Sequence, residues 1–407
     1  MVMQFEVVII GGGPGGATAA ILLARAGWSV AVVEKVSFPR RKVCGEYISA
    51  TNLPLLRQLG LSETFEERAG PEIRQVGIFA RDTILLTDMP RPREGSGGWG
   101  RALGREQLDT LLLARAAEAG AMVLQPWSAT ALTRTGNGYV CRITAKNTAE
   151  ERDLEARVVI AAHGSWEPGT LPTQPAHQSA RASDLLGFKA HFRESALPAG
   201  LMPLLVFPGG YGGMVHSDGG RVSLSCCIRR DQLERCRRRK PDASAAEAVL
   251  AHIEANCLGV RQALAGAQLE GKWLAVGPIR PGIRARYSDG IFLVGNAAGE
   301  AHPVIAEGIT IAMQSAWLVA ARLTARRREV LAGESLDKLG RDYSTAWRRS
   351  FAPRLHASSA LAHWAMRPAA VALVLPVLRR LPSVLAWGAR WSGKATEVVV
   401  TGTPATP

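Results

Sequence analysis

The sequence has little cysteine, and none of it is arranged to bind a metal or to form a disulfide network. Its six cysteines are spread over 407 residues without a C-x-x-C pair, and no histidine lies at metal-ligand spacing from them. We therefore expect no metal site and no disulfide framework. An unbroken apolar run of the roughly 18 to 20 residues that a membrane span needs is also absent, which excludes an integral membrane protein. Because no basic leader precedes the first apolar segment, we expect a cytoplasmic protein.

Acidic residues are in the minority, and the formal net charge is +14. Clustered Lys and Arg would point to nucleic acid or anionic lipid as a partner. Here the basic residues are scattered, with short runs such as those at 237–240 and 326–328, so we expect no nucleic-acid partner. A basic scaffold that binds membrane or nucleic acid is the weakest functional hypothesis. The length predicts two packed units with enough interior to bury a cofactor.

The amino-terminal segment has the pattern of a dinucleotide-binding turn. An apolar run at 5–10 leads into a glycine-rich turn at 11–16 and then into a helix-forming stretch. In such a turn Gly11 permits the bend, Gly13 lets the backbone approach a pyrophosphate, and Gly16 allows close packing of helix on strand. The next expected strand, at 28–33, ends at an acid suited to hydrogen-bond a ribose. The residues expected to contact the dinucleotide here are Gly11, Gly13, Pro14, Gly15, Gly16, Ala17, Glu34 and Lys35.

Three later segments carry a family resemblance. The strand IFLVG at 291–295 runs into Asn296-Ala297-Ala298-Gly299, His302-Pro303 and Glu307-Gly308-Ile309 before a long helix. This order resembles the second flavin motif of the p-hydroxybenzoate hydroxylase-like superfamily, in which the helix points its positive end at the flavin ring. Arg105-x-x-Leu108-Asp109 resembles the family's helix whose Arg reaches the flavin phosphates or ribitol. The segment 38–47 (FPRRKVCGEY) is similar to the Cys-Gly segment of geranylgeranyl reductases and related dehydrogenase-type flavoproteins.

The resemblance implies an FAD-dependent oxidoreductase of the geranylgeranyl reductase and dehydrogenase-flavoprotein branch. Asn296 departs from the family pattern because it stands where Asp is usual, although its amide oxygen can still accept from a ribitol hydroxyl. His163 replaces the Asp of an Asp-Gly motif that aromatic hydroxylases use around the flavin and NADPH pyrophosphates, which weakens the case for the usual NADPH handling. The further cofactor contacts that the resemblance implies are Lys42, Cys44, Gly45, Arg105, Asn296, Pro303, Gly308 and Ile309.

The resemblance also suggests four catalytic candidates beside the flavin ring, namely Cys44, Glu46, Tyr47 and His302. The alternative for Cys44 is a small buried hydrophobe packed under the flavin. Glu46 and Tyr47 could exchange a proton with the substrate, and His302 could supply one to the reduced flavin or the substrate. A His before Pro is equally typical of a turn. We interpret His191 as an ordinary strand residue.

We predict an α/β chain (α+β overall) with a Rossmann-like FAD-binding domain, an inserted antiparallel β-sheet substrate domain and a helical C-terminal region. The bounds are 1–70, 101–170 and 273–330 for the first, 71–100 and 171–272 for the second, and 331–395 for the third. The apolar stretch 369–378, flanked by arginines, permits two interpretations: a helical cap over the substrate cavity, or a basic amphipathic surface that touches membrane or a lipid substrate. We expect disorder at 401–407.

These observations predict an enzyme that uses FAD to reduce or form a carbon–carbon double bond in an apolar isoprenoid, polyketide or acyl-derived molecule. NAD(P)H or an external donor would supply the electrons. The main alternative is a flavin-dependent monooxygenase that hydroxylates or epoxidises an aromatic or polyketide secondary metabolite, because it would share the fold and the first fingerprint. We find no Trp-x-Trp-x-Ile-Pro segment, which would point to a flavin-dependent halogenase.

Overall fold

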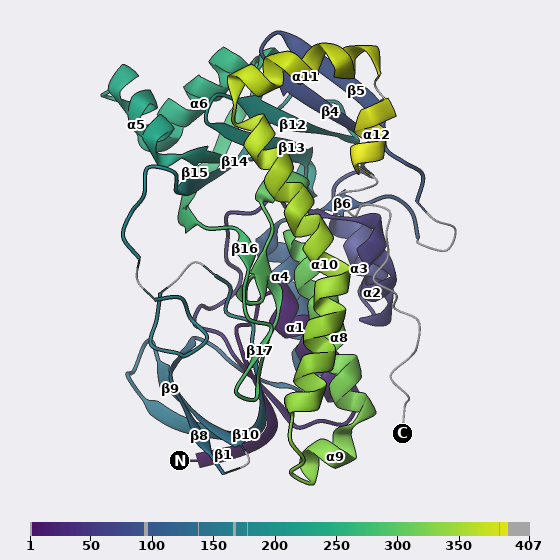
Figure 1. Ribbon diagram of the computed structural model, residues 1–407, viewed down its shortest axis with the longest axis vertical. Coiled ribbons are helices and arrows are strands. Elements are labelled where there is room, and N and C mark those ends of the chain that lie inside the picture. Colours follow the sequence, from purple (N-terminus) through teal and green to yellow (C-terminus); the bar gives the residue numbers. More distant parts are fainter. Residues whose placement is uncertain are drawn as a thin grey trace.

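The computed structural model describes residues 2–92, 97–136, 138–165, 168–176, 178–381 and 383–389. One large sheet occupies the lower half of the molecule and a second occupies the upper half, and helices flank both (Figure 1). This arrangement confirms the predicted α/β, α+β class. The segment at 401–407 and the end of the predicted helical region, 390–395, lie outside the described residues.

The lower sheet has a parallel core with the strand order β18-β10-β1-β2-β7. The apolar run that ends β1 is fully buried, as expected for a parallel strand covered on both faces. At one edge β17 pairs antiparallel with β18, and β9 and β8 extend β10 as an antiparallel meander. The strands are β1 (Val2–Ile10), β2 (Val30–Val33), β7 (Met122–Leu124), β8 (Trp127–Thr135), β9 (Gly138–Ala145), β10 (Glu151–Ala161), β17 (Tyr287–Ser288) and β18 (Ile291–Leu293).

Three helices cover this sheet and bring distant motifs together. Helix α1 (Pro14–Arg25) starts at the glycine turn and packs against both α4 (Arg105–Glu118) and α8 (Gly308–Ala325). Their apolar faces and the strands form one continuous core. The three segments that carry the resemblance therefore meet around the amino terminus of α1.

The upper sheet has the order β15-β11-β14-β13-β12-β4-β5. Every pairing is antiparallel except that of β4 with β12, so the predicted antiparallel sheet contains one parallel pair. Segments of period-two character at 73–86, 185–193, 201–207 and 221–229 predict the hairpin and three further strands, but β13 and β15 were not predicted. The strands are β4 (Gln75–Ala80), β5 (Thr83–Asp88), β11 (Leu185–Arg193), β12 (Leu201–Phe207), β13 (Gly210–His216), β14 (Val222–Arg229) and β15 (Gln268–Ile279).

Different helices cover the two faces of the upper sheet. One face packs against α5 (Arg230–Arg239), α6 (Ala245–Asn256) and α7 (Leu258–Ala263). The other face packs against the end of α10 and against α11. Alternate residues along each strand point to opposite faces, so the two cores remain separate.

The C-terminal region consists of the long α10 (Asp337–Ala365), α11 (Pro368–Arg380) and α12 (Ser383–Ala389). Helix α10 runs up the molecule beside both sheets, and α11 turns across the upper sheet (Figure 1). No single helix among the described residues has the length and hydropathy to span a membrane. The pair α10 and α11 meets that test only when both helices are taken together, and they are bent by 103°.

Short elements connect the two sheets. The pairs β3 with β6 and β16 with β19 are antiparallel two-stranded ladders. The remaining elements are β3 (Tyr47–Ile48), α2 (Leu53–Gln58), α3 (Ser62–Arg68), β6 (Arg101–Ala102), β16 (Gly282–Ile283), β19 (Gly299–Glu300), α9 (Arg327–Leu331) and the 3₁₀ turns Ala50–Asn52, Asp218–Gly220, Gly295–Ala297 and Pro303–Ile305.

Candidate active site

In the glycine turn between β1 and α1, Gly11 and Gly16 are tightly packed, whereas Gly13 borders open space. A Cβ on Gly16 would lie 1.8 Å from the carbonyl oxygen of Gly11, and Gly11 itself has φ +108°. These two glycines are required by the packing of strand and helix. A Cβ on Gly13 would instead lie 3.7 Å from Arg105 Nη2 and 3.9 Å from Arg40 Nη2. The backbone of Gly13 therefore borders a space lined by two guanidinium groups, which suits a pyrophosphate.

The acid that ends β2 lies at the same turn. Glu34 is 3% exposed, and its Oε2 accepts the N–H of Gly12 at 2.9 Å while its Oε1 accepts that of Val36 at 3.1 Å. This is the position expected of a ribose-binding carboxylate. Lys35 follows it, and partial burial lowers the pKa of its ammonium group.

Three cations converge near Gly13. Arg105 donates from Nε and Nη2 to the two oxygens of Asp109, each at 2.7 Å, and this bidentate pair fixes the guanidinium. Arg40 Nη2 lies 3.6 Å from Glu34 and 3.7 Å from Asp109. Burial lowers the pKa of Lys42 to about 8, and the neighbouring Arg105 and Arg40 contribute to that shift. Positive charge is crowded here, so the residues fit the two phosphates of FAD.

In the second flavin motif, the carboxamide of Asn296 is held by the buried carboxylate of Glu300. Asn296 Nδ2 donates to Oε1 of Glu300 at 3.0 Å, and Glu300 Oε2 accepts from Ser165 Oγ at 2.8 Å. Arg284 Nη2 lies 3.4 Å from Glu300 Oε2. Because the amide nitrogen is committed to Glu300, the Oδ1 of Asn296 is the atom oriented to accept from a ribitol hydroxyl.

The start of α8 is open to a cofactor. A Cβ added at Gly308 would meet nothing within 4 Å, and Ala306 before it has a left-handed backbone with φ +55°. Pro303 and the following turn line a cavity, whereas Ile309 is buried in the core. The positive end of α8 therefore faces a region in which a flavin ring can lie.

The Cys-Gly segment is anchored to the upper sheet by a buried charged cluster. Glu46 has a left-handed backbone with φ +62°, and its carboxylate contacts Lys189 Nζ at Oε1 and His191 Nε2, 2.9 Å away, at Oε2. The backbone N–H of Arg105 donates to the same carboxylate at 3.3 Å. Burial alone would raise the pKa of Glu46, but Lys189 and His191 hold it well below its usual range. Arg41 Nη2 donates to His191 Nδ1 at 2.7 Å, so the ring hydrogen is on Nε2.

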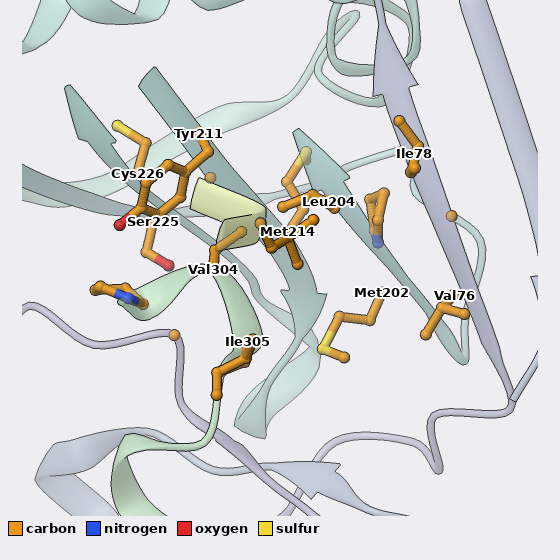
Figure 2. Close-up of a pocket in the computed structure, with 18 of the residues that line it drawn as sticks. Val76, Ile78, Met202, Leu204, Tyr211, Met214, Ser225, Cys226, Val304 and Ile305 are labelled. Carbon is orange, nitrogen blue, oxygen red and sulfur yellow. The ribbon is translucent and has the colours of Figure 1, made fainter. Parts of the chain in front are cut away.

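A cavity of about 530 Å³ lies between the upper sheet and the C-terminal helices. Its walls come from the Cys-Gly segment, from β4, β12, β13 and β14, from the turn at 303–306, and from α10, α11 and α12. Figure 2 shows aliphatic and thioether side chains around the space, with the hydroxyl groups of Tyr211 and Ser225 on one side. No Asp, Glu, Lys, Arg or His occurs among the described residues that line it.

The four catalytic candidates occupy different positions. Cys44 lines the cavity, whereas Glu46 is in the charged cluster. Tyr47 is buried outside the cavity lining, and burial together with the charge of Glu307 raises its pKa well above normal. His302 lies behind the cavity wall, with Nδ1 3.1 Å from the hydroxyl of Tyr211. Burial, followed by the charge of His363, lowers the pKa of His302 to about 4.

Several residues of this site carried no motif in the sequence. Ser225 lines the cavity, Glu300 supports the Asn296 carboxamide, and Lys189 and His191 hold the Cys-Gly segment. The interpretation of His191 as an ordinary strand residue missed its two polar partners. A signal was available, because Lys189 and His191 are polar residues two apart in an otherwise apolar strand, which places both on one face.

A flavoprotein that binds a dinucleotide has the features found here: a glycine turn, an acid at the end of β2, a cation cluster and an open start of α8. The chain belongs to the FAD binding domain family, which it matches over residues 4–357. It is an FAD-dependent oxidoreductase. This confirms the predicted cofactor, enzyme class and superfamily.

The relatives of this chain include a lipid reductase and a halogenase. The chain is 28% identical over 324 residues to digeranylgeranylglycerophospholipid reductase 2 of Methanopyrus kandleri, covering 75% of this chain and 74% of that protein. It is 25% identical over 336 residues to tryptophan 2-halogenase of Chondromyces crocatus, covering 81% and 62%. The structure of the myxobacterial chondrochloren halogenase CndH superposes with a TM-score of 0.76 at 19% identity, covering 95% and 91%. That likeness shows a shared fold.

Proposed function

We propose that the protein uses FAD to reduce, or in the reverse direction to form, a carbon–carbon double bond in an apolar isoprenoid, polyketide or acyl-derived substrate. The observation that carries this proposal is the cavity beside Cys44 and Gly45, in which no described lining residue is charged. Such a cavity favours an apolar molecule held by shape and contact area. FAD supplies the redox chemistry when bound, and the surrounding side chains orient the substrate and exclude water.

The relatives support the same substrate class. The archaeal relatives are reductases of digeranylgeranylglycerophospholipids, and a menaquinone reductase of Mycobacterium tuberculosis is 30% identical over 163 residues. We propose NAD(P)H or an external donor as the reductant. The second candidate function is a flavin-dependent monooxygenase acting on an aromatic or polyketide metabolite, and the similarity to tryptophan 2-halogenase favours it.

An anaerobic half-reaction tests the leading function. The protein, loaded with FAD and reduced with dithionite, is mixed with geranylgeraniol, and flavin reoxidation is followed by absorbance. We expect reoxidation together with a product that has gained two hydrogen atoms, whereas the fully saturated alcohol should give neither. If reoxidation requires air and the product carries ¹⁸O from ¹⁸O₂, the monooxygenase function replaces the reductase function.

A variant that fills the cavity provides the matched control. A Cβ on Gly213 would meet only the carbonyl oxygen of Pro203, at 3.5 Å, and Gly213 lines the cavity. Gly213→Leu should therefore fold and bind FAD with an unchanged visible spectrum. It should lose the reaction with geranylgeraniol because the leucine occupies the substrate space.

We also propose that α11 brings a cytoplasmic protein to the membrane surface. Leu373, Val377 and Leu381 are 77%, 52% and 53% exposed, and Arg379 and Arg380 lie beside them. Other residues of α11 and α12 line the cavity, so the helix that carries this apolar face also forms part of the cavity wall. The protein should sediment with phosphatidylglycerol vesicles more than with phosphatidylcholine vesicles, and Leu373→Glu should weaken both interactions. Equal sedimentation of the variant and the wild type would contradict this proposal.

We retain the three-part domain division as a proposal with one change. The predicted boundary at 273 falls within β15, which pairs with β11 of the upper sheet. We therefore propose that the substrate domain extends to Ile279.

A further inference from the structure

Reduction of a carbon–carbon double bond adds a hydride to one carbon and a proton to the other. The hydride comes from reduced FAD, so the proton must come from a group that borders the substrate. No charged residue or histidine lines the described part of the cavity. The following inference rests on the proposed reductase function and concerns the source of this proton.

The exchangeable protons on the described cavity wall belong to the side chains of Cys44, Tyr211, Ser225, Cys226, Cys227 and Trp364. Burial raises the pKa of the Cys226 thiol well above its usual range and that of the Cys227 thiol to about 12, and the side-chain partner of Cys227 is Tyr211 itself. The indole N–H of Trp364 is committed to the carbonyl oxygen of Ala370 at 3.2 Å. Tyr211 differs from these groups because its hydroxyl is hydrogen-bonded to a histidine behind the wall.

Two histidines lead from Tyr211 to the surface. His302 Nδ1 lies 3.1 Å from the Tyr211 hydroxyl, and the backbone N–H of His302 donates to Ser358 Oγ at 3.1 Å, which fixes its position. The rings of His302 and His363 have centroids 6.0 Å apart. His363 is exposed on α10, and its Nδ1 lies 2.7 Å from the carbonyl oxygen of Ser359. Because a carbonyl only accepts, that nitrogen carries the hydrogen and Nε2 remains to exchange a proton with water.

We propose that Tyr211 is the proton donor to the substrate and that His302 and His363 restore its proton from solvent. One carbon of the double bond gains the hydride, and the π electrons form a bond from the other carbon to the hydroxyl proton of Tyr211. The phenolate oxygen takes the Nδ1 proton of His302, and Nε2 of His302 takes one from His363 or from water next to it. The balance is one hydride, which carries two electrons, from reduced FAD and one proton from solvent, which gives a saturated bond and oxidised FAD.

The protonation states agree with these roles. Burial raises the pKa of Tyr211 well above its usual value, with the charges of Cys227 and Glu300 adding to it, so the phenol keeps its proton until the substrate takes it. With its pKa near 4, His302 is neutral at pH 7 and can accept a proton on one nitrogen as it gives one from the other.

The test compares Tyr211→Phe with Tyr287→Phe. The first variant keeps the aromatic ring and removes the hydroxyl, and the second removes a hydroxyl that bonds Asp337 at 2.9 Å, remote from the cavity lining. Both should bind FAD and be reduced by dithionite like the wild type. In D₂O the wild type and Tyr287→Phe should give a product with two solvent deuteriums, because the hydride hydrogen of dithionite-reduced FAD also comes from solvent, whereas reoxidation of Tyr211→Phe by geranylgeraniol should slow by about 10²-fold or more.

A second pair of measurements separates proton transfer from packing. His302→Ala should lose the reaction and regain part of it when imidazole is added, which a purely structural role would not produce. If Tyr211→Phe forms the deuterated product at the wild-type rate, the donor assignment is overturned while the reductase function stands. If the wild type itself hydrogenates neither geranylgeraniol nor another polyprenyl alcohol, the reductase function fails and the relay fails with it.

Discussion

Replacing Glu46 by Gln should destabilise the protein strongly although the change is nearly isosteric. The Glu46 and Lys189 side chains are both 0% exposed, and removing one partner of a buried ion pair costs about 3 to 5 kcal/mol. The carboxylate accepts from the Arg105 N–H at one oxygen and from His191 at the other, and Gln has a single acceptor oxygen, so it can keep only one of these two hydrogen bonds. We therefore expect a loss of about 3 kcal/mol or more, because the Lys189 ammonium loses its counter-charge and one buried donor loses its acceptor.

Urea unfolding, followed by circular dichroism with and without FAD, measures this loss. The double variant Glu46→Gln with Lys189→Met removes both charges and should recover to within about 1 kcal/mol of the wild type. The pKa of Glu46 is lowered on folding, so its contribution is complete above the unfolded carboxyl pKa of about 4.3 and is lost as the pH falls below it. The difference in the free energy of unfolding between the wild type and the single variant should therefore decrease below that pH. A single variant that loses less than about 1 kcal/mol would refute the buried-pair reasoning.

Three further predictions concern the cofactor site. Gly13→Ala should fold like the wild type, since its methyl group would meet neighbours only at van der Waals distance, but should weaken FAD binding at least about tenfold, or 1.4 kcal/mol, in fluorescence titrations; unchanged affinity would place the phosphates elsewhere. FAD affinity should fall as the pH rises above about 8, because the phosphates raise the lowered pKa of Lys42 and binding must then take up a proton; Lys42→Met should remove this dependence. Restoring the family's usual acid with Asn296→Asp should reduce thermal stability by about 1 to 3 kcal/mol, since Glu300 loses its donor and faces a second carboxylate, and adding Glu300→Gln should reverse the loss; a neutral single variant would contradict this account.

The parts of the site that the sequence predicted are those fixed by local spacing. The turn around Gly11 and Gly16 could be recognised because strand, bend and helix follow one another within a few residues, and the close approach in the structure leaves no room for a side chain. Arg105 and Asp109 are four residues apart on one helix, so a sequence motif records their contact. The two-sheet architecture followed from the same kind of local signal in most strands.

The contacts that the sequence did not predict join segments far apart in the chain. Tyr211 and His302 are separated by 91 positions, and Glu46 and Lys189 by 143. Neither pair has a fixed spacing, because each depends on how the upper sheet is placed over the Cys-Gly segment. Strand β13 was missed for a related reason: its glycines weaken the β-forming pattern even though they allow close pairing with β14.

Residues 42–46 connect the cation cluster, the cavity wall and the upper sheet. Lys42 stands among the cations at one end, Cys44 and Gly45 form part of the cavity wall, and Glu46 is locked into the upper sheet. Only three residues separate Lys42 from Glu46. A restraint on the position of one of these residues therefore limits the movement of the other. Phosphates bound beside Lys42 should therefore restrain the part of the cavity wall that Cys44 and Gly45 form.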